Sequence, residues 1–149
     1  LVLTTGNKSE MATGYATLYG DMAGGFAVLK DVLKTVVYQL SKWRNSQLAI
    51  IPQRIITRAP SAELRANQTD QDSLPEYAVL DRIIQLLVEE NLSTTQIINQ
   101  GMDSDSVYQV AHLLKINEYK RRQAAVGPRL SATAFAKDWR YPITNGYKF

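Results

Sequence analysis

The sequence contains no cysteine, which excludes disulfide bonds and thiol catalysis within its 149 residues. Its one histidine, His112, has no second histidine or cysteine to complete a zinc site, and we assign it no role. No apolar run approaches the roughly 20 residues that would span a bilayer, so membrane insertion is not expected. The lack of cysteine also fits a reducing compartment, and we expect the protein in the cytoplasm.

A hydrophobic fraction of 45% and a charged fraction of 21% are typical of an ordinary globular domain. A chain of this length can bury about 68–70% of its unfolded surface, so stability alone requires no metal. The sequence opens without methionine, on apolar residues that are typical of a strand. We therefore expect it to begin partway through a longer polypeptide.

The first third of the sequence predicts one strand and two helices. Leu1–Thr5 is apolar and β-branched and ends at Gly6, which is typical of a buried strand leading into an active-site loop. A short helix is expected over residues 9–18, followed by a glycine-rich turn over 20–25. Asp31 is placed to cap the next helix. The apolar face expected of that helix comprises Val32, Val36, Val37, Leu40 and Trp43.

The middle of the sequence predicts an extended segment, a loop and a helix. Residues 50–57 are expected to be extended. The polar stretch over 59–73 forms a loop, and a loop of this length is uncommon unless it is functional. A helix follows Pro75, because apolar residues then recur at helical spacing. These residues are Tyr77, Leu80, Ile84 and Leu87.

Two more helices are expected towards the C-terminus. Ser93–Gln96 has the capping-box pattern of a short helix that ends at Gly101. The next helix begins at Ser104 or Asp105, and its inward residues are Val107, Val110, Ala111 and Leu114. Basic residues gather late in the chain and give this region the charge to meet a polyanion. They are Lys120, Arg121, Arg122, Arg129, Lys137 and Arg140.

Six groups of residues, in order along nearly the whole chain, carry a family resemblance. They are Leu3–Glu10 with Gly14, Tyr15 and Tyr19–Asp21, then Asp31–Thr35, Pro60–Arg65, Asp70–Tyr77, Asn117–Gln123 and Arg140–Asn145. In this order they resemble the NAD⁺ synthetase family. The Lys120–Gln123 run and the Tyr141–Asn145 ending resemble its glutamine-dependent branch.

The sequence departs from the family pattern in two ways. Leu33 stands where the Asp-Val-Pro-Lys-Thr pattern has proline, which should alter entry into the helix more than chemistry. The Ser-Gly-Gly-x-Asp-Ser phosphate loop is absent, as is the N-terminal glutaminase domain with its cysteine nucleophile. The resemblance therefore implies that residues 1–149 are the C-terminal part of the synthetase domain and carry half of an active site.

The resemblance also implies a fold and an activity. The fold is α/β, a fragment of an adenine-nucleotide α-hydrolase-like (Rossmann-like) domain with a helix-rich C-terminal portion. The activity is that of a carbon–nitrogen ligase, which adenylates deamido-NAD⁺ with ATP and Mg²⁺ and then amidates it with ammonia from glutamine to give NAD⁺. The implied partners are these substrates and other copies of the subunit in a homo-oligomer. The fragment alone is expected to be inactive.

Seven residues are assigned to the site by resemblance. They are Thr5, Lys34 and Ser61 for ATP, Asp21, Lys120 and Arg121 for deamido-NAD⁺, and Glu10 for Mg²⁺. The residues themselves also support plainer interpretations. Lys34 by periodicity alone is a solvent-facing helix lysine, and Glu10 is favoured in a first helical turn by its charge. Tyr15 and Tyr19, four residues apart, are more often core residues than stacking platforms.

Two other functions fit the sequence less well. The helices after Ser93 and Gly101, with the basic run after them, resemble a helix-turn-helix that binds nucleic acid. However, the second helix begins with Asp103 and Asp105, which would repel phosphates at the end that should read bases, so we expect no nucleic-acid partner. A non-enzymatic interaction module is the third possibility.

Overall fold

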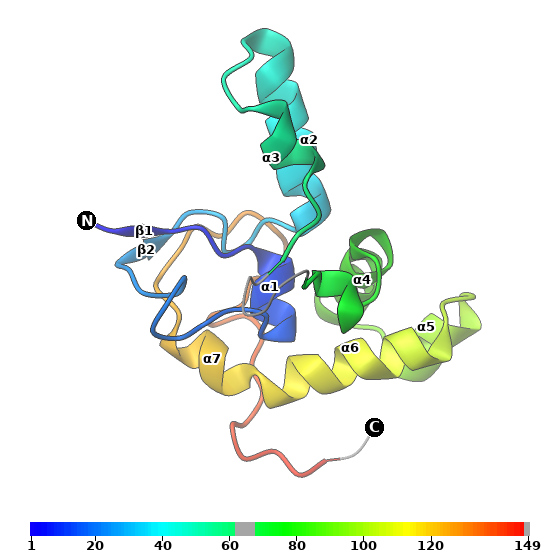
Figure 1. Ribbon diagram of the computed structural model, residues 1–149. Helices are drawn as coiled ribbons and strands as arrows, with labels where there is room; N and C mark the ends of the chain where they lie inside the picture. Colours follow the sequence, from blue (N-terminus) through cyan, green and yellow to red (C-terminus); the bar gives the residue numbers. More distant parts are fainter. Residues whose placement is uncertain (62–67, 148–149) are drawn as a thin grey trace.

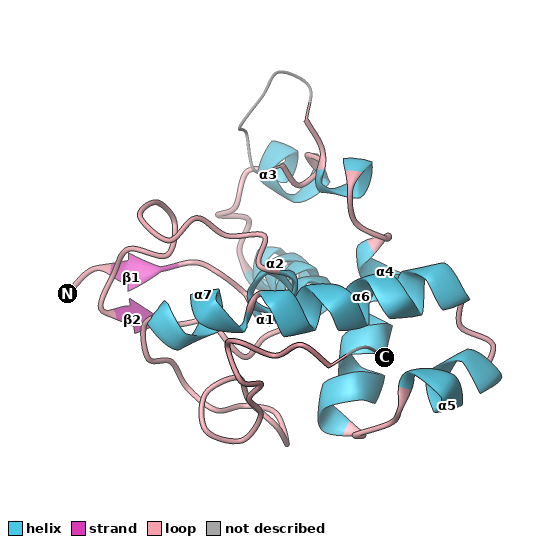
Figure 2. Cartoon of the chain, turned by 90° about the horizontal axis from the view of Figure 1, so that it is seen from below, coloured by secondary structure: helices cyan, strands magenta, loops and turns pink. Residues whose placement is uncertain are grey.

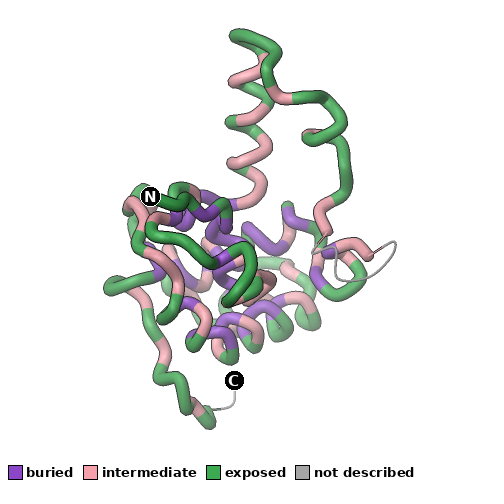
Figure 3. The backbone as a smooth tube through the Cα atoms, turned by 60° about the vertical axis from the view of Figure 1, so that its left-hand side comes forward, coloured by how far each residue is buried: buried purple, intermediate pink, exposed green. Residues whose placement is uncertain are grey.

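The computed structural model describes residues 1–61 and 68–147. Within these ranges the chain forms a helical body with a small parallel sheet at one edge and a helical arm that projects from the body (Figure 1). The buried residues lie in the body and not along the arm (Figure 3). No helix in the described ranges is both long enough and apolar enough to cross a membrane.

The sheet pairs two very short strands, β1 (Leu3–Thr4) and β2 (Phe26–Ala27), in parallel. Leu3 is opposite Phe26 and Thr4 is opposite Ala27. The prediction of a buried strand over Leu1–Thr5 is wrong in length and burial, because Leu1 is 96% exposed. Within the described residues β2 is the one neighbour of β1, so most of the apolar surface of β1 is not covered.

Helix α1 (Lys8–Thr13) follows the sheet directly. The side chain of Asn7 accepts a hydrogen bond from Glu10 N, and Glu10 accepts one from Asn7 N, so the two form a capping box. Gly14 ends the helix at φ 72°, where a side chain would also collide with Asn117. The predicted helix over 9–18 therefore exists but stops five residues early.

The arm consists of α2 (Lys34–Gln47) and α3 (Gln53–Thr57). Three predictions are wrong here. Asp31 does not cap α2, because it lies in the turn before Leu33, the N-cap residue, and its carboxylate binds Lys8 instead. The apolar face does not point inward, since Trp43 is 62% exposed and no residue of α2 is buried. Residues 53–57 form a helix where an extended segment was expected.

The body is built from the downstream helices. They are η1 (Asp70–Asp72), α4 (Tyr77–Ile84), which continues into the π-helical turn η2 (Gln85–Glu89), then α5 (Thr94–Asn99), α6 (Ser104–Ile116) and α7 (Glu118–Gln123). The predicted capping box at Ser93 and the predicted start of α6 are confirmed. The inward residues of α6 predicted from spacing are all buried, as are Leu80 and Ile84 of α4. Of the long loop predicted over 59–73, residues 62–67 lie outside the described ranges.

The segment after α7 runs back across the body (Figure 2). Phe135 joins the hydrophobic core there. The fully buried Lys8 ties this segment to α1: its ammonium donates to Ser131 Oγ at 2.7 Å and to the Thr133 carbonyl at 2.9 Å. Two carboxylates, those of Asp31 and Glu89, balance its charge at 3.0 and 2.7 Å. This network keeps the N-terminus of α1 fixed beneath the cavity described next.

Candidate active site

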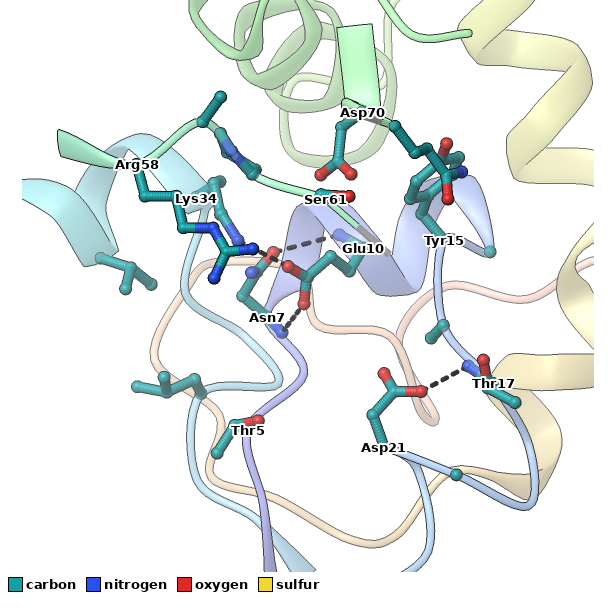
Figure 4. A pocket seen from close by; sticks show the side chains of 18 of the residues that line it. Thr5, Asn7, Glu10, Tyr15, Thr17, Asp21, Lys34, Arg58, Ser61 and Asp70 are labelled. Carbon is teal, nitrogen blue, oxygen red and sulfur yellow. Dashed lines mark hydrogen bonds and ion pairs between the residues drawn. The ribbon is translucent and has the colours of Figure 1, made fainter. Parts of the chain in front are cut away.

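A cavity of about 900 Å³ lies between the loop before α1, the base of the arm, the loop before η1 and α7. Charged and hydroxyl side chains from these separate segments converge on it (Figure 4). The residues that line it include Thr5, Asn7, Glu10, Tyr15, Asp21, Leu29, Lys34, Val37, Tyr38, Arg58, Ser61, Asp70 and Lys120. Both polar and apolar groups therefore line its wall, as expected of a site for a large polar ligand.

Six of the seven residues assigned by resemblance line this one cavity, although they are up to 115 positions apart in sequence. They are Thr5, Glu10, Asp21, Lys34, Ser61 and Lys120. The segment Ala62–Arg65, which belongs to the same resemblance as Ser61, lies outside the described residues. The seventh residue, Arg121, does not line the cavity.

Glu10 is held on the cavity wall by two contacts. Its Oε1 lies 2.7 Å from the Lys34 ammonium, and its Oε2 accepts a hydrogen bond from Asn7 N at 3.1 Å. Both Glu10 and Lys34 are mostly but not completely buried. The two charges that the resemblance assigns to metal and to ATP thus form an ion pair with each other.

A buried carboxylate positions Lys34 at the first turn of α2. Asp81, on α4, accepts hydrogen bonds from Thr35 N and Thr35 Oγ1, both at 2.8 Å, and from Ser9 Oγ. The Lys34 N–H in turn donates to Ser9 Oγ at 2.9 Å. Because Leu33 provides no side-chain cap, Asp81 and Ser9 satisfy two of the free N–H groups of α2, those of Thr35 and Lys34, from outside the helix.

The opposite part of the wall comes from the turn after α1. Asp21 is exposed and accepts a hydrogen bond from Thr17 N at 2.6 Å, so it partly fills the local capping role typical of a loop aspartate. Tyr15 lines the cavity and bonds to Ser73 Oγ at 2.9 Å. Tyr19 is 92% exposed and does not line the cavity, so the interpretation of both tyrosines as core residues is wrong for Tyr19.

The two basic residues of α7 take different positions. Lys120 reaches the cavity, where its ammonium donates to the carbonyls of Gly14 and Ala16 at 2.7 and 2.8 Å. Arg121 is buried, bonds to Glu118 at 3.0 Å and to the carbonyls of Ala12 and Leu114, and faces the Phe135 ring. Its expected contact with deamido-NAD⁺ is therefore not supported, because its guanidinium holds α7 to α1 and α6.

The same arrangement weakens the nucleic-acid interpretation. The basic run lies on α7, a separate helix from α6, and the N-terminal end of α6 carries Asp103 and Asp105. Two of its cations, Lys120 and Arg121, are engaged by the protein itself. A nucleic-acid backbone would thus meet the acidic N-terminal end of α6 and, on α7, two cations that already bind other groups of the protein.

Several residues on the wall were not assigned from the sequence, among them the polar or charged Asn7, Arg58 and Asp70. Asp70 is only 3% exposed, and its Oδ2 accepts a hydrogen bond from the Tyr77 hydroxyl at 2.5 Å. Burial, and next the hydrogen bond to Asp70, raise the pKa of Tyr77 far above its usual value, so the hydroxyl stays protonated and donates. Asp70 opens the segment Asp70–Tyr77 of the family resemblance, and that membership was the available signal.

The wall offers few ligands for a metal ion. Across residues 1–61 and 68–147 no group of three or more His, Cys, Asp or Glu side chains is arranged to hold one. Mg²⁺, however, commonly takes one or two protein carboxylates and completes its shell with water and substrate phosphates. Glu10 fits that requirement, because each of its oxygens keeps a second lone pair beyond its present contact.

Comparison with known proteins gives a consistent result. Residues 1–124 match the family model described as NAD synthase. Over 99% of its length the chain is 59% identical to a glutamine-dependent NAD(+) synthetase from Acinetobacter baylyi, and the match covers 28% of that protein. Over 99% of its length it is also 56% identical to a glutamine-dependent NAD(+) synthetase from Aquifex aeolicus, and that match covers 26% of the relative. The chain thus spans about a quarter of the length of these curated relatives.

Two solved structures are also similar. A glutamine-dependent NAD(+) synthetase from Cytophaga hutchinsonii matches 97% of the chain and 24% of its own length with a TM-score of 0.72 at 26% identity. The enzyme from Acinetobacter baumannii in complex with adenosine diphosphate matches 99% of the chain and 26% of its own length with a TM-score of 0.50 at 51% identity. These likenesses confirm the α/β fold class expected from the sequence.

Proposed function

The chain belongs to the NAD synthase family, and we propose that it provides one half of the active site of a glutamine-dependent NAD⁺ synthetase. The complete protein then acts as a carbon–nitrogen ligase on deamido-NAD⁺, ATP and ammonia derived from glutamine. The observation that carries this proposal is the convergence of six separately assigned residues on one cavity.

The reaction explains why such a cavity is needed. A carboxylate is a poor electrophile, so its oxygen first attacks the α-phosphorus of ATP, which forms an acyl adenylate and releases pyrophosphate. Ammonia then forms a bond to the acyl carbon as the carbon–oxygen bond to AMP breaks, and nitrogen loses a proton. Both steps develop negative charge on phosphate oxygens, which fixed cations stabilise.

The residues of the cavity suit these two substrates. Lys34 presents a compact charge on a flexible side chain, which suits an ATP phosphate. Thr5 and Ser61 offer hydroxyl groups, and Leu29 and Val37 offer apolar surface for a base. Asp21 and Lys120, from the turn after α1 and from α7, are assigned to deamido-NAD⁺.

Glu10 would hold Mg²⁺ by one carboxylate oxygen. When bound, this ion neutralises phosphate charge and makes pyrophosphate a better leaving group. A similar enzyme from Acinetobacter baumannii binds adenosine diphosphate, which supports nucleotide binding here. The ion pair with Lys34 holds the Glu10 carboxylate ready on the wall.

Other components lie outside this chain under the proposal. They are the phosphate loop that cradles the pyrophosphate and the glutaminase domain that releases ammonia. A homo-oligomer in the cytoplasm also stays a prediction. The exposed apolar side chains of α2, such as Leu40 and Trp43, are candidates for its contacts.

The test is made on the full polypeptide that carries this chain. Mass spectrometry follows NAD⁺ formation from deamido-NAD⁺, ATP and glutamine, with nicotinate as an alternative acceptor. We expect NAD⁺, AMP and pyrophosphate in equal amounts with deamido-NAD⁺ and none with nicotinate. Turnover of ATP to ADP, or no product with either acceptor, would contradict the proposed function.

A further inference from the structure

A second cavity, of about 420 Å³, lies between the turn before α2, helix α7 and the chain that follows α7. Among the described residues it shares no lining residue with the candidate active site. Its cations are Lys30, of the turn before α2, and most of the basic residues that gather late in the sequence. These late residues are Arg121, Arg122, Arg129, Lys137 and Arg140.

Two carboxylates on the same wall already have partners. Asp31 forms an ion pair with Lys8 at 3.0 Å, and Asp138 forms one with Arg129 at 3.0 Å. The wall thus carries an excess of positive charge that its own carboxylates do not balance.

Lys30 is a buried cation without a counter-charge. It is 7% exposed, and its ammonium donates one hydrogen bond, to the Ala125 carbonyl at 2.7 Å. Among the residues that the structure describes, no carboxylate forms an ion pair with it. Burial therefore lowers the pKa of this ammonium below its usual value. Since an ammonium has three donors, Lys30 can still donate to a ligand.

Arg121 shows the same deficit at a second point of the wall. It is 6% exposed, and both of its terminal nitrogens donate to the protein, but its Nε has no partner in the described ranges. A buried donor without an acceptor is costly, and a buried charge without a counter-charge is more so. Two buried cations in one cavity therefore favour the binding of an anion.

We propose that this second cavity binds a phosphate group, either as free phosphate or as the end of a small phosphomonoester. A phosphate carries a charge of about −1.5 to −2 and several acceptor oxygens, so it meets both needs of Lys30, the charge and the hydrogen bonds. A carboxylate would bring one charge and two oxygens. Arg122, Lys137 and Arg140 are exposed and attract the anion to the cavity.

The cavity also has an apolar part. Phe135, Ala134 and Val126 line it beside the cations, and they offer a surface to the body of a phosphomonoester. The volume of about 420 Å³ lies within the range of small-molecule sites.

A bound phosphate would join segments that support the candidate active site. Lys30 precedes Asp31, whose carboxylate holds Lys8 of α1, and it lies four residues before Lys34. Because the ligand would tie this turn to α7 and to the chain after it, its binding should raise the thermal midpoint as its concentration rises. The proposal does not depend on the proposed function.

Calorimetric titration of the full polypeptide with inorganic phosphate and with phenyl phosphate tests the proposal. We expect saturable binding of both in the wild type and in Lys34→Ala, which changes the other cavity. Lys30→Met keeps the length of the side chain but loses its charge, and it should weaken binding about tenfold or more. Exposed Lys42→Met is the matched control. Tighter binding of phenyl phosphate would identify a phosphomonoester as the ligand, and equal affinities would identify free phosphate.

Three results would overturn the proposal. They are no binding by the wild type, equal binding by Lys30→Met and the wild type, and binding that is lost in Lys34→Ala but kept in Lys30→Met. The last result would place the phosphate in the candidate active site.

A crystal soak of the wild type tests the site even where Lys30→Met does not fold. Arsenate, a phosphate mimic with an anomalous signal, should give density beside the Lys30 ammonium, and excess phosphate should remove it. Arsenate bound elsewhere, with none in the second cavity, would contradict the proposal.

Discussion

The Lys34 ammonium and Glu10 Oε1 lie 2.7 Å apart, so the residue assigned to ATP phosphate and the residue assigned to Mg²⁺ neutralise each other's charge. A bound Mg²⁺–nucleotide offers each of them a new partner of opposite charge. The ion pair therefore keeps two charged groups in place at low cost to stability until the substrate exchanges with them.

The two proposed halves of the cavity should respond to mutation separately. Lys34→Ala should raise the KM for ATP, and Asp21→Ala should raise the KM for deamido-NAD⁺. Each loses a charge-assisted contact worth roughly 1.5–3 kcal/mol, which is about tenfold to more than a hundredfold. Steady-state kinetics of the full polypeptide measure both, with exposed Lys42→Ala as control. Equal effects on one substrate in both variants would refute the residue assignments.

Asp81 should act on ATP only through Lys34. Asp81→Asn weakens the hydrogen bonds to Thr35 and Ser9, which should lower the free energy of unfolding by roughly 1–3 kcal/mol and loosen the first turn of α2. We expect Asp81→Asn to raise the KM for ATP in the wild type but to add nothing to the effect of Lys34→Ala in the double variant. Additive effects of the two changes would show that Asp81 does not work through Lys34.

Acid should weaken the contact of the C-terminal segment with α1. Burial alone would raise the pKa of Asp31, but hydrogen bonds from the backbone of Ser131 and Leu130, from the Ser131 hydroxyl and from Lys8 outweigh it and lower the pKa. Because the pKa of Asp31 is lower in the folded protein than in the unfolded chain, its carboxylate stabilises the fold fully at pH values above its unfolded pKa near 3.8. This stabilisation is lost as the pH falls below that value.

The thermal midpoint of the full polypeptide, followed from about pH 6 to pH 2.5, measures this effect. Asp31→Asn should lower the midpoint at neutral pH and flatten its fall in acid. Exposed Asp105→Asn serves as the control. An Asp31→Asn variant whose midpoint falls with acid as steeply as that of the wild type would count against this role for Asp31.

The sequence predicted the body of the molecule better than its edges. Spacing correctly placed Val107, Val110 and Leu114 inside α6, because a helix packed on a core repeats its apolar residues at helical intervals. The same spacing failed on α2, where Leu40 and Trp43 face outward. Apolar periodicity indicates that one face of a helix is to be covered. It does not indicate whether another part of the same protein or a second copy of it provides the covering surface.

The family resemblance pointed to six residues that line one cavity, but the sequence did not predict the contacts that they make. Local patterns indicated Glu10 and Lys34 only with the help of the family resemblance. Asp70 went unassigned, because a carboxylate in a polar stretch normally indicates solvent exposure. In the structure its carboxylate accepts a hydrogen bond from the hydroxyl of Tyr77, which lies seven residues later at the start of α4. Arg121 was placed in the site by the family resemblance, whereas in the structure it is buried and forms an ion pair with Glu118.

These 149 residues made alone should bind ATP poorly and form no NAD⁺. None of the glycines in the chain follows a strand in a serine-rich loop that could cradle pyrophosphate. Loss of such a set of backbone donors should cost more than the ~2.7–4 kcal/mol seen for one transition-state donor. Calorimetric titration with ATP and an NAD⁺ assay provide the check. Micromolar ATP binding, or turnover above background, would contradict the half-site proposal.

Glu10 is the residue on which the proposed adenylation site depends most. Pyrophosphate release by the Glu10→Gln variant of the full polypeptide, measured at several Mg²⁺ concentrations with deamido-NAD⁺ and ATP, therefore tests the account most directly. The exposed Glu90→Gln serves as control. We predict at least a tenfold loss at limiting Mg²⁺, whether ammonia or glutamine is supplied, because the metal loses a carboxylate ligand. A rate at limiting Mg²⁺ close to that of the wild type would remove Glu10 from the site and contradict the account.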